Sequence, residues 1–111
     1  MQVQVSQRGA VAVVRADGAV TRAEADELKA CAADALSRQF GRMVLDMAAV
    51  PYVDSRGLEV LVELNEALAA AGSVLKLCRV NATVREILDL TGLSSDFEQY
   101  DEVNAGVRSF L

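Results

Sequence analysis

Apolar and polar positions alternate at the start of the chain. Val3 and Val5 stand between polar neighbours, and a second apolar run follows over residues 10–14. The two runs are separated by Gln7, Arg8 and Gly9. Alternation with a period of two is typical of a strand, and a glycine between two such runs favours a tight turn. The sequence therefore predicts an N-terminal β-hairpin.

Two longer segments carry apolar residues at helical spacing. The first covers residues 22–38 and follows Thr21, which stands three residues before Glu24. This spacing is typical of a capping box, in which each side chain accepts a backbone N–H at the start of the helix. The second segment begins at about Ser55 and ends before Gly72. Its apolar stripe consists of Leu58, Leu61, Val62 and Leu68.

The remaining apolar segments are shorter. We expect strands at residues 43–45, 74–80 and 97–100. We expect one helix between a cap at Asn81 or Thr83 and Gly92, and another over residues 103–111. Helices thus alternate with strands after the hairpin, which predicts an α/β fold with a mixed, mostly parallel sheet of four to five strands and helices packed against it. At 111 residues the chain is expected to form one domain, residues 1–111.

Composition and charge narrow the classes of function. Hydrophobic residues make up 52% of the sequence and charged residues 24%, which indicates a globular domain with a dense core. The net charge of −5 disfavours a nucleic-acid partner, because a phosphate backbone would be repelled. No apolar stretch reaches the roughly 18 residues of a membrane span, and the first residues do not resemble an export signal. We therefore expect a cytoplasmic protein without membrane insertion.

The residue types also disfavour catalysis. The sequence contains no histidine, which excludes serine-histidine catalysis and histidine-ligated metals. It has no glycine-rich phosphate loop, and Cys31 and Cys78 form neither a disulfide framework nor a Cys-x-x-Cys pair. We interpret both cysteines as small core residues. The sequence thus predicts no enzyme activity, no metal site and no cofactor.

Two sets of acidic residues are further candidates for chemistry. Asp46 and Asp54 lie on either side of a loop and could converge as an acid-base pair, but separate structural roles at a strand end and a helix start are favoured. Glu59, Glu63 and Glu66 share a helical stripe. We predict that this stripe is a solvated helix face, and the alternative is an acidic docking surface.

Ser55 has three candidate roles. As a nucleophile it is poor, because no base stands nearby and the Gly-x-Ser-x-Gly elbow is absent. Structurally, either Asp54 or Ser55 is expected to cap the second helix. A helix N-terminus also has free N–H groups and a positive dipole end, so it accommodates a phosphate. A phosphate on Ser55 would oppose a docked partner while leaving the fold intact.

Two segments resemble the STAS domain family, in particular the bacterial anti-sigma factor antagonists. The first runs Val44-Leu45-Asp46-Met47 and continues to Val53-Asp54-Ser55-Arg56-Gly57-Leu58. The second runs from Val84 to Leu93 and ends in Thr-Gly-Leu. The order of the predicted elements is also that of the family. The likeness covers essentially the whole chain.

The resemblance implies a partner switch. In that family the dephosphorylated domain binds a serine kinase that doubles as an anti-sigma factor, and phosphorylation of the serine after the aspartate dissociates the pair. Carried over, Ser55 is the expected phosphoacceptor, and Asp54, Arg56 and Gly57 frame the docking loop. A phosphatase would restore the binding form.

Two positions depart from the family's pattern. Arg56 stands where the family often has a small residue, and it could pair with the phosphate or with an acid on the partner. Thr21 stands near the expected docking surface, where relatives often carry an acid, so the recognised kinase is expected to be unusual. An alternative function is that of a STAS interaction subunit of an ABC-type lipid transport complex. The Asp-Ser-x-Gly motif at residues 54–57 favours the switch.

Overall fold

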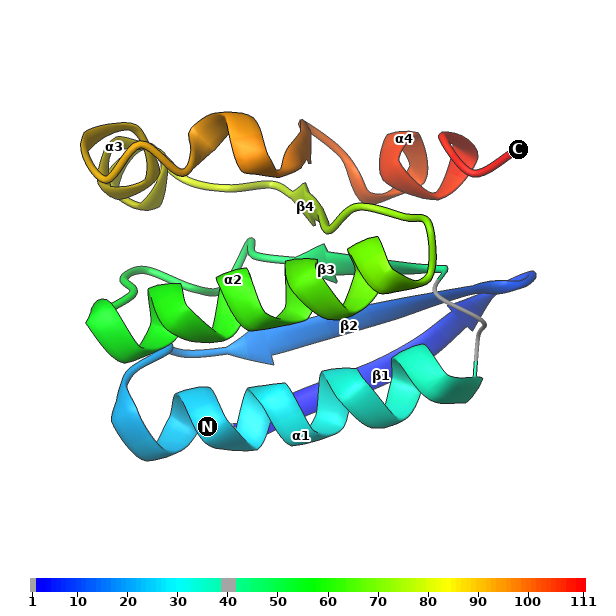
Figure 1. The fold of residues 1–111 in the computed structure, drawn as a ribbon, viewed down its shortest axis with the longest axis horizontal. Coiled ribbons are helices and arrows are strands. Elements are labelled where there is room, and N and C mark those ends of the chain that lie inside the picture. Colours follow the sequence, from blue (N-terminus) through cyan, green and yellow to red (C-terminus); the bar gives the residue numbers. More distant parts are fainter. Residues whose placement is uncertain (1, 39–41) are drawn as a thin grey trace.

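A five-stranded mixed sheet forms the centre of the molecule (Figure 1). The computed structural model describes residues 2–38 and 42–111. Its strands are β1 (Gln2–Arg8), β2 (Val11–Asp17), β3 (Met43–Asp46), β4 (Lys76–Cys78) and β5 (Glu98–Tyr100). Its helices are α1 (Arg22–Arg38), α2 (Ser55–Ala70), α3 (Ala82–Leu90) and α4 (Val103–Arg108), with a 3₁₀ turn, η1 (Ser94–Asp96), before β5.

The strands follow one another across the sheet in the order β1-β2-β3-β4-β5. β1 and β2 form the antiparallel hairpin predicted from the alternating pattern, and Gly9 has a φ of +62° in its turn. The other neighbouring pairs are parallel. Parallel neighbours require crossover connections, and α1, α2 and α3 lie in these connections. The predicted α/β architecture is confirmed.

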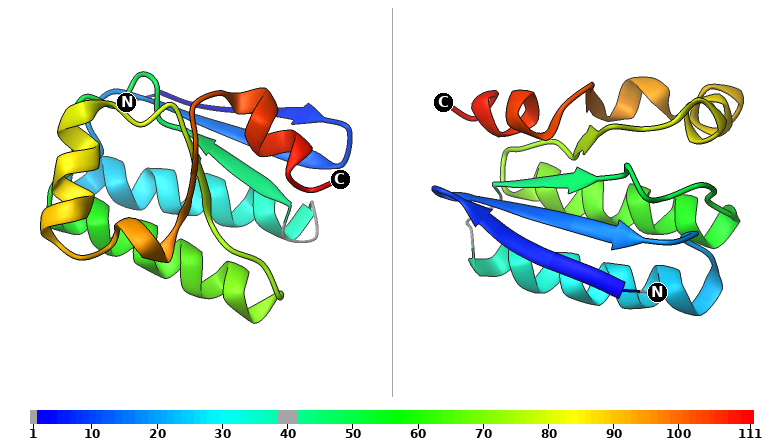
Figure 2. Two further views of the ribbon diagram at one scale, coloured as in Figure 1. Left: turned by 90° about the horizontal axis from the view of Figure 1, so that it is seen from above. Right: turned by 180° about the vertical axis from the view of Figure 1, so that it is seen from behind.

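The sheet separates two apolar cores, because successive side chains of a strand point to opposite faces. Ala12, Val14 and Ala16 of β2 point into the larger core, to which α1, α2 and α3 all contribute. Val11 and Val13 point into a smaller core packed against α4. Figure 2 shows α1 and α2 side by side, with α4 apart from them. The start of α2 therefore belongs to the side of the molecule that holds the larger core.

The smaller core contains a buried cation. Lys76 is 6% exposed, and its ammonium donates to Glu98 Oε1 at 3.1 Å and to Ser109 Oγ at 2.7 Å. The ammonium also lies 4.2 Å from the centre of the Phe110 ring. These contacts compensate the buried charge and attach the C-terminal segment to the sheet. Cys78 is a free, buried core residue as expected, and burial raises the pKa of its thiol to about 11, whereas Cys31 is only half-buried.

Several element boundaries differ from the predictions. β2 extends beyond residue 14 to Asp17, because Ala16 stays buried while Arg15 and Asp17 lie on the other face of the same strand. β4 covers only Lys76–Cys78, since both of its neighbours pair with it over these residues alone. α4 ends at Arg108 instead of reaching the last residue.

The predicted capping box at Thr21 is wrong. The amides of Glu24 and Ala25 donate to the backbone carbonyl of Thr21, at 3.0 and 3.4 Å, and not to its side chain. The first residue of α1, Arg22, has a φ of +43°, so the backbone here departs from the geometry that a side-chain cap requires. At α3 the sequence left Asn81 and Thr83 as possible caps. Asn81 is the cap, because its side chain accepts the amide of Val84 at 2.8 Å.

The buried face of α2 is rotated relative to the predicted stripe. Its buried residues are Gly57, Val60, Leu61, Leu64 and Leu68. Leu58 and Val62, which the prediction placed within the core, are only half-buried and pack at its margin. This rotation leaves apolar surface beside the start of the helix.

Candidate functional site at the start of α2

The loop before α2 is held against the loop before α1. Val20 and Val53 form a parallel bridge, and the amide of Asp54 donates to the carbonyl oxygen of Val20 at 3.3 Å. Thr21 follows Val20 directly and is half-buried. Two segments distant in sequence are therefore adjacent, and Thr21 lies at the same edge as Asp54 and Ser55.

Gly57 makes this contact close. A Cβ atom at position 57 would lie 2.3 Å from the carbonyl oxygen of Val20 and 2.5 Å from Cγ1 of Val53. Both distances are far inside van der Waals contact. The first turn of α2 therefore packs directly on the backbone of Val20, and only glycine permits this.

Asp54 is the N-cap of α2. Its Oδ1 accepts the amide of Gly57 at 2.8 Å, and its backbone is extended, with φ −92° and ψ −174°. Ser55 is the first residue of the helix and is exposed. Of the two caps considered from the sequence, Asp54 is the one that forms, so Ser55 stands at the first helical position.

Ser55 stands where the helix offers unpaired donors. The amide of Gly57 is taken by the Asp54 side chain, and Leu58 begins the helical ladder by donating to the Asp54 carbonyl at 2.9 Å. The amides of Ser55 and Arg56 have no acceptor within residues 2–38 and 42–111. Together with the positive end of the helix dipole, these amides favour a negative group at this position.

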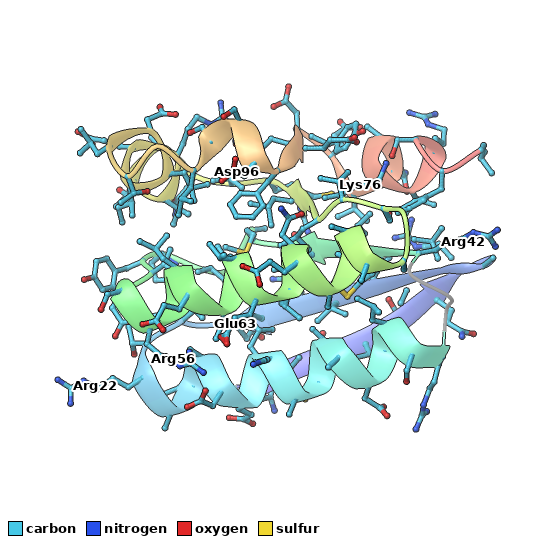
Figure 3. All side chains as sticks on the ribbon, in the orientation of Figure 1. Arg22, Arg42, Arg56, Glu63, Lys76 and Asp96 are labelled. Carbon is cyan, nitrogen blue, oxygen red and sulfur yellow. The ribbon has the colours of Figure 1, made fainter. Side chains whose placement is uncertain are left out.

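Arg56 faces acids of its own chain. Its Nε donates to Asp26 Oδ1 of α1 at 3.1 Å, and Nη2 donates to the same oxygen. Nη1 donates to Glu63 Oε1 at 3.0 Å and to Glu59 Oε2 at 3.4 Å. Lys29 of α1 donates to the other oxygen of Glu63 at 3.0 Å. Figure 3 shows Arg56 and Glu63 between the two helices.

The network of Asp26, Lys29, Arg56, Glu59 and Glu63 shifts the titration of its members. The hydrogen bond with Asp26 raises the pKa of the Arg56 guanidinium. The hydrogen bond from Lys29 lowers the pKa of Glu63, and Arg56 adds to this effect. Three carboxylates meet two cations here, so the surface between α1 and α2 is net negative. The sequence suggested two counterparts for Arg56, a phosphate and an acid on a partner protein. It did not suggest these acids of the same chain.

The acidic stripe of α2 is only partly a solvated face. Glu59 and Glu66 are exposed, as predicted. Glu63 is half-buried and bridges the two helices through Lys29 and Arg56. The prediction is therefore wrong for Glu63, because the packing of α1 on α2 places two cations beside it.

A shallow depression of about 370 Å³ lies beside Ser55. Its lining consists of Ser55, Leu58, Glu59, Val62, Glu63 and Leu93. Leu93 follows α3, so the depression joins α2 to a segment from later in the chain. Sequence reasoning missed this feature, although Leu58 and Val62 at the margin of the apolar stripe were its signal.

Asp46 and Asp54 have separate roles. Asp46 is 3% exposed, and its carboxylate accepts Nε and Nη2 of Arg79 at 3.1 and 2.6 Å. The amide of Ala48 donates to it at 3.1 Å, and Nη1 of Arg15 lies 3.5 Å away. Burial raises the pKa of Asp46, but the hydrogen bonds from Arg79 and Ala48 outweigh burial and hold the pKa below its ordinary value. The structural interpretation of the two acids is therefore the correct one.

Two further kinds of site are absent from the part of the chain that the structure describes. Over residues 2–38 and 42–111, no three histidine, cysteine, aspartate or glutamate side chains are grouped so that they could hold a metal ion. Each helix in these ranges is too short or too polar to span a membrane.

The site residues predicted from the sequence do lie together, at the junction of the two loops. They are Thr21, Asp54, Ser55, Arg56 and Gly57.

Comparison with known proteins assigns the chain to a family. The model of the STAS domain family matches residues 2–106. The chain therefore belongs to the STAS domain family, and the resemblance seen in the sequence is confirmed.

Two relatives match most of the chain. BtrV of Bordetella bronchiseptica, named as a candidate anti-sigma factor antagonist, is 30% identical over 93 residues, which are 84% of this chain and 80% of that protein. The anti-sigma F factor antagonist of Paenibacillus polymyxa is 29% identical over 107 residues, which are 95% of this chain and 92% of that protein.

Solved structures share the fold at lower identity. A candidate anti-sigma factor antagonist from Thermotoga maritima superposes with a TM-score of 0.88 at 20% identity, over 96% of this chain and 92% of that one. The Bacillus cell fate determinant SpoIIAA, in its phosphorylated form, superposes with a TM-score of 0.71 at 18% identity, over 97% of this chain and 99% of that one. The predicted STAS-like fold is thus confirmed.

Proposed function

We propose that this chain is an anti-sigma factor antagonist. It binds a serine-kinase anti-sigma factor while Ser55 is unmodified, which frees the sigma factor for transcription, and phosphorylation of Ser55 ends the binding. The names of the two relatives support this role, and the phosphorylated form of SpoIIAA supports its mode of control. The observation that carries the proposal is the exposed position of Ser55 on the first turn of α2, directly beside the apolar depression.

Phosphorylation of Ser55 requires no catalytic group on this chain. The partner kinase transfers the γ-phosphoryl group of ATP to Ser55 Oγ, so that an O–P bond forms, ADP leaves and the hydroxyl proton passes to a base of the kinase. A phosphatase hydrolyses the same bond and restores the binding form. The phosphate stands beside the free amides of Ser55 and Arg56, and the fold tolerates it for this reason.

The phosphate opposes docking because of its surroundings. It adds nearly two negative charges to the margin of a depression whose apolar lining includes Leu58 and Val62. Glu59 already contributes negative charge there, whereas the charge of Glu63 is compensated by Lys29 and Arg56. A partner that covers the depression would have to desolvate the phosphate, and an acidic group on that partner would be repelled. Affinity thus changes while the fold does not. This role places the protein in the cytoplasm, where sigma factors act.

Affinity purification from the native cells tests the proposal. The tagged chain is expressed as wild type, Ser55→Ala and Ser55→Asp, and the captured proteins and the Ser55 peptide are identified by mass spectrometry. We expect a kinase-like protein with the wild type and with Ser55→Ala, its loss with Ser55→Asp, and phosphate on Ser55 of the wild type. Circular dichroism and denaturant unfolding verify that both variants fold equally well.

Two results would overturn the proposal. Recovery of the kinase-like protein in equal amounts with both variants would show that charge at position 55 does not control binding. Recovery of a transport ATPase in place of a kinase would favour the alternative role as a subunit of a lipid transport complex.

A further inference from the structure

We propose that Arg56 leaves Asp26 and binds the phosphate when Ser55 is phosphorylated. This inference rests on the proposed function, because it concerns the modified form of Ser55. In the unmodified chain the Arg56 guanidinium connects the first turn of α2 to α1. Phosphorylation would exchange this contact between two helices for a contact within the first turn of α2.

The position of Glu59 indicates that Arg56 can reach the phosphate. Residues four apart share one face of a helix, and helical side chains tilt toward its N-terminus. The Glu59 carboxylate therefore extends back toward the turn that carries Ser55. Nη1 of Arg56 lies 3.4 Å from that carboxylate. The guanidinium thus already contacts a side chain that shares a helix face with Ser55.

Two of the three acids that hold Arg56, namely Asp26 and Glu59, are weak competitors for it. The side chains of Asp26 and Glu59 are 61% and 66% exposed, so water screens both pairs. A phosphate carries nearly two charges and three acceptor oxygens, and a guanidinium binds it in a bidentate manner. Glu63 keeps a cation after the exchange, because Lys29 remains bonded to it. The balance of charge therefore favours transfer of Arg56 to the phosphate.

The exchange extends the effect of phosphorylation to α1. Asp26 lies in the first turns of α1, close in sequence to Thr21. Once Arg56 has left, the Asp26 carboxylate carries no cation from α2. The partner then meets negative charge on both helices, and the contact between these helices is looser than before.

The second pKa of the phosphate, ordinarily about 6, reports the contact directly. Phosphoserine is incorporated at position 55 during synthesis of the full chain, and its pKa is followed by ³¹P NMR. Arg56→Gln should raise this pKa by roughly 0.3–0.7, the range that corresponds to an exposed ion pair. Asp26→Asn should lower the pKa, because Arg56 then has one competitor fewer.

Arg22→Gln is the matched control, since it removes an equal charge nearby. Figure 3 shows Arg22 directed away from α2, and the phosphate pKa should change by less than about 0.1. An equal phosphate pKa in the wild type and in Arg56→Gln would overturn the inference. Because the phosphate is incorporated during synthesis, this result does not depend on a native kinase. Failure of the proposed function is seen separately, as an unmodified Ser55 in cells.

Discussion

Gly57 determines how closely the first turn of α2 approaches the loop before α1. The carbonyl oxygen of Val20 occupies the space that a Cβ at position 57 would need, and this oxygen also accepts the amide of Asp54. The exposed position of Ser55 therefore depends on a contact between backbone atoms two residues away. A side chain at position 57 would have to displace the whole loop.

Gly57→Ala should destabilise the fold by about 2 kcal/mol. Overpacking against backbone costs up to about 3 kcal/mol, and the higher helix propensity of alanine offsets only about 1 kcal/mol of this. Urea unfolding of the variant and the wild type measures the difference. Ser55→Ala, an exposed change in the same turn, is the control and should stay within about 0.5 kcal/mol of the wild type. An unchanged midpoint for Gly57→Ala would mean that the loops separate at no cost.

Single residues of the site differ in how far the sequence could predict them. Local chemistry narrows the N-cap of α2 to Asp54 or Ser55, since a cap is set by neighbours in sequence, and the structure shows that Asp54 forms it. The partner of Arg56 is not set by such neighbours, because Asp26 lies on another helix and meets Arg56 only through the packing of α1 on α2. Periodicity within one helix carries no information about that pairing.

At the scale of elements, Asp46 connects three strands. It stands at the end of β3, binds Arg79 just after β4 and lies near Arg15 of β2. Arg79 has a φ of +58°, a backbone conformation that is unfavourable for residues other than glycine. The ion pair therefore helps to hold the carboxyl ends of these strands in place.

The contribution of Asp46 to stability should disappear in acid. Its pKa is lower in the folded chain than the ordinary value of 3.8, so the unfolded chain takes up a proton first as the pH falls. The contribution is fully present above about pH 5 and is lost as the pH falls through 3.8 toward the folded pKa. Asp46→Asn should lower the free energy of unfolding by about 2 kcal/mol at pH 7, which is less than for a fully buried pair because Arg79 is partly exposed. Below about pH 5 the stability of this variant should fall less steeply than that of the wild type.

Urea unfolding between pH 7 and pH 3 measures this difference. Val44→Ala, a buried truncation on the same strand, is the control that lowers stability without removing a titrating group. Its stability should decline with pH as in the wild type. Parallel declines for Asp46→Asn and the wild type would show that the ion pair does not stabilise the fold.

The positions of the helices and strands were largely predictable from the sequence, whereas the face that each helix buries was not. The hairpin and the long helices follow from periods of two and 3.6 residues, which depend on sequence alone. The buried face of α2 was predicted only in part: Leu61 and Leu68 are buried as predicted, whereas Leu58 and Val62 are half-buried. Leu58, Val62 and Leu64 are equally apolar, and only the direction from which the sheet packs on the helix decides which of them is covered. The depression beside Ser55 is the consequence of that choice.

At the scale of the molecule, the proposed switch lies on one side of a sheet that packs against an apolar core on each of its faces. The larger core joins α1, α2 and α3 to the sheet, and α4 with Lys76 closes the smaller core. Ser55 lies at the end of a helix whose buried face is already filled by core residues. A phosphate there changes the surface of the domain and leaves both cores intact.

The most direct test of this account is the affinity of the captured anti-sigma factor for two forms of the chain, measured by calorimetry. One form carries phosphoserine at position 55, and the control carries it at Ser95, an exposed serine of η1. We predict that phosphate at position 55 weakens binding by about 100-fold or more, because like charges and desolvation oppose docking, and that phosphate at position 95 changes it less than about 3-fold. Equal affinities of the two phosphorylated forms would contradict the account.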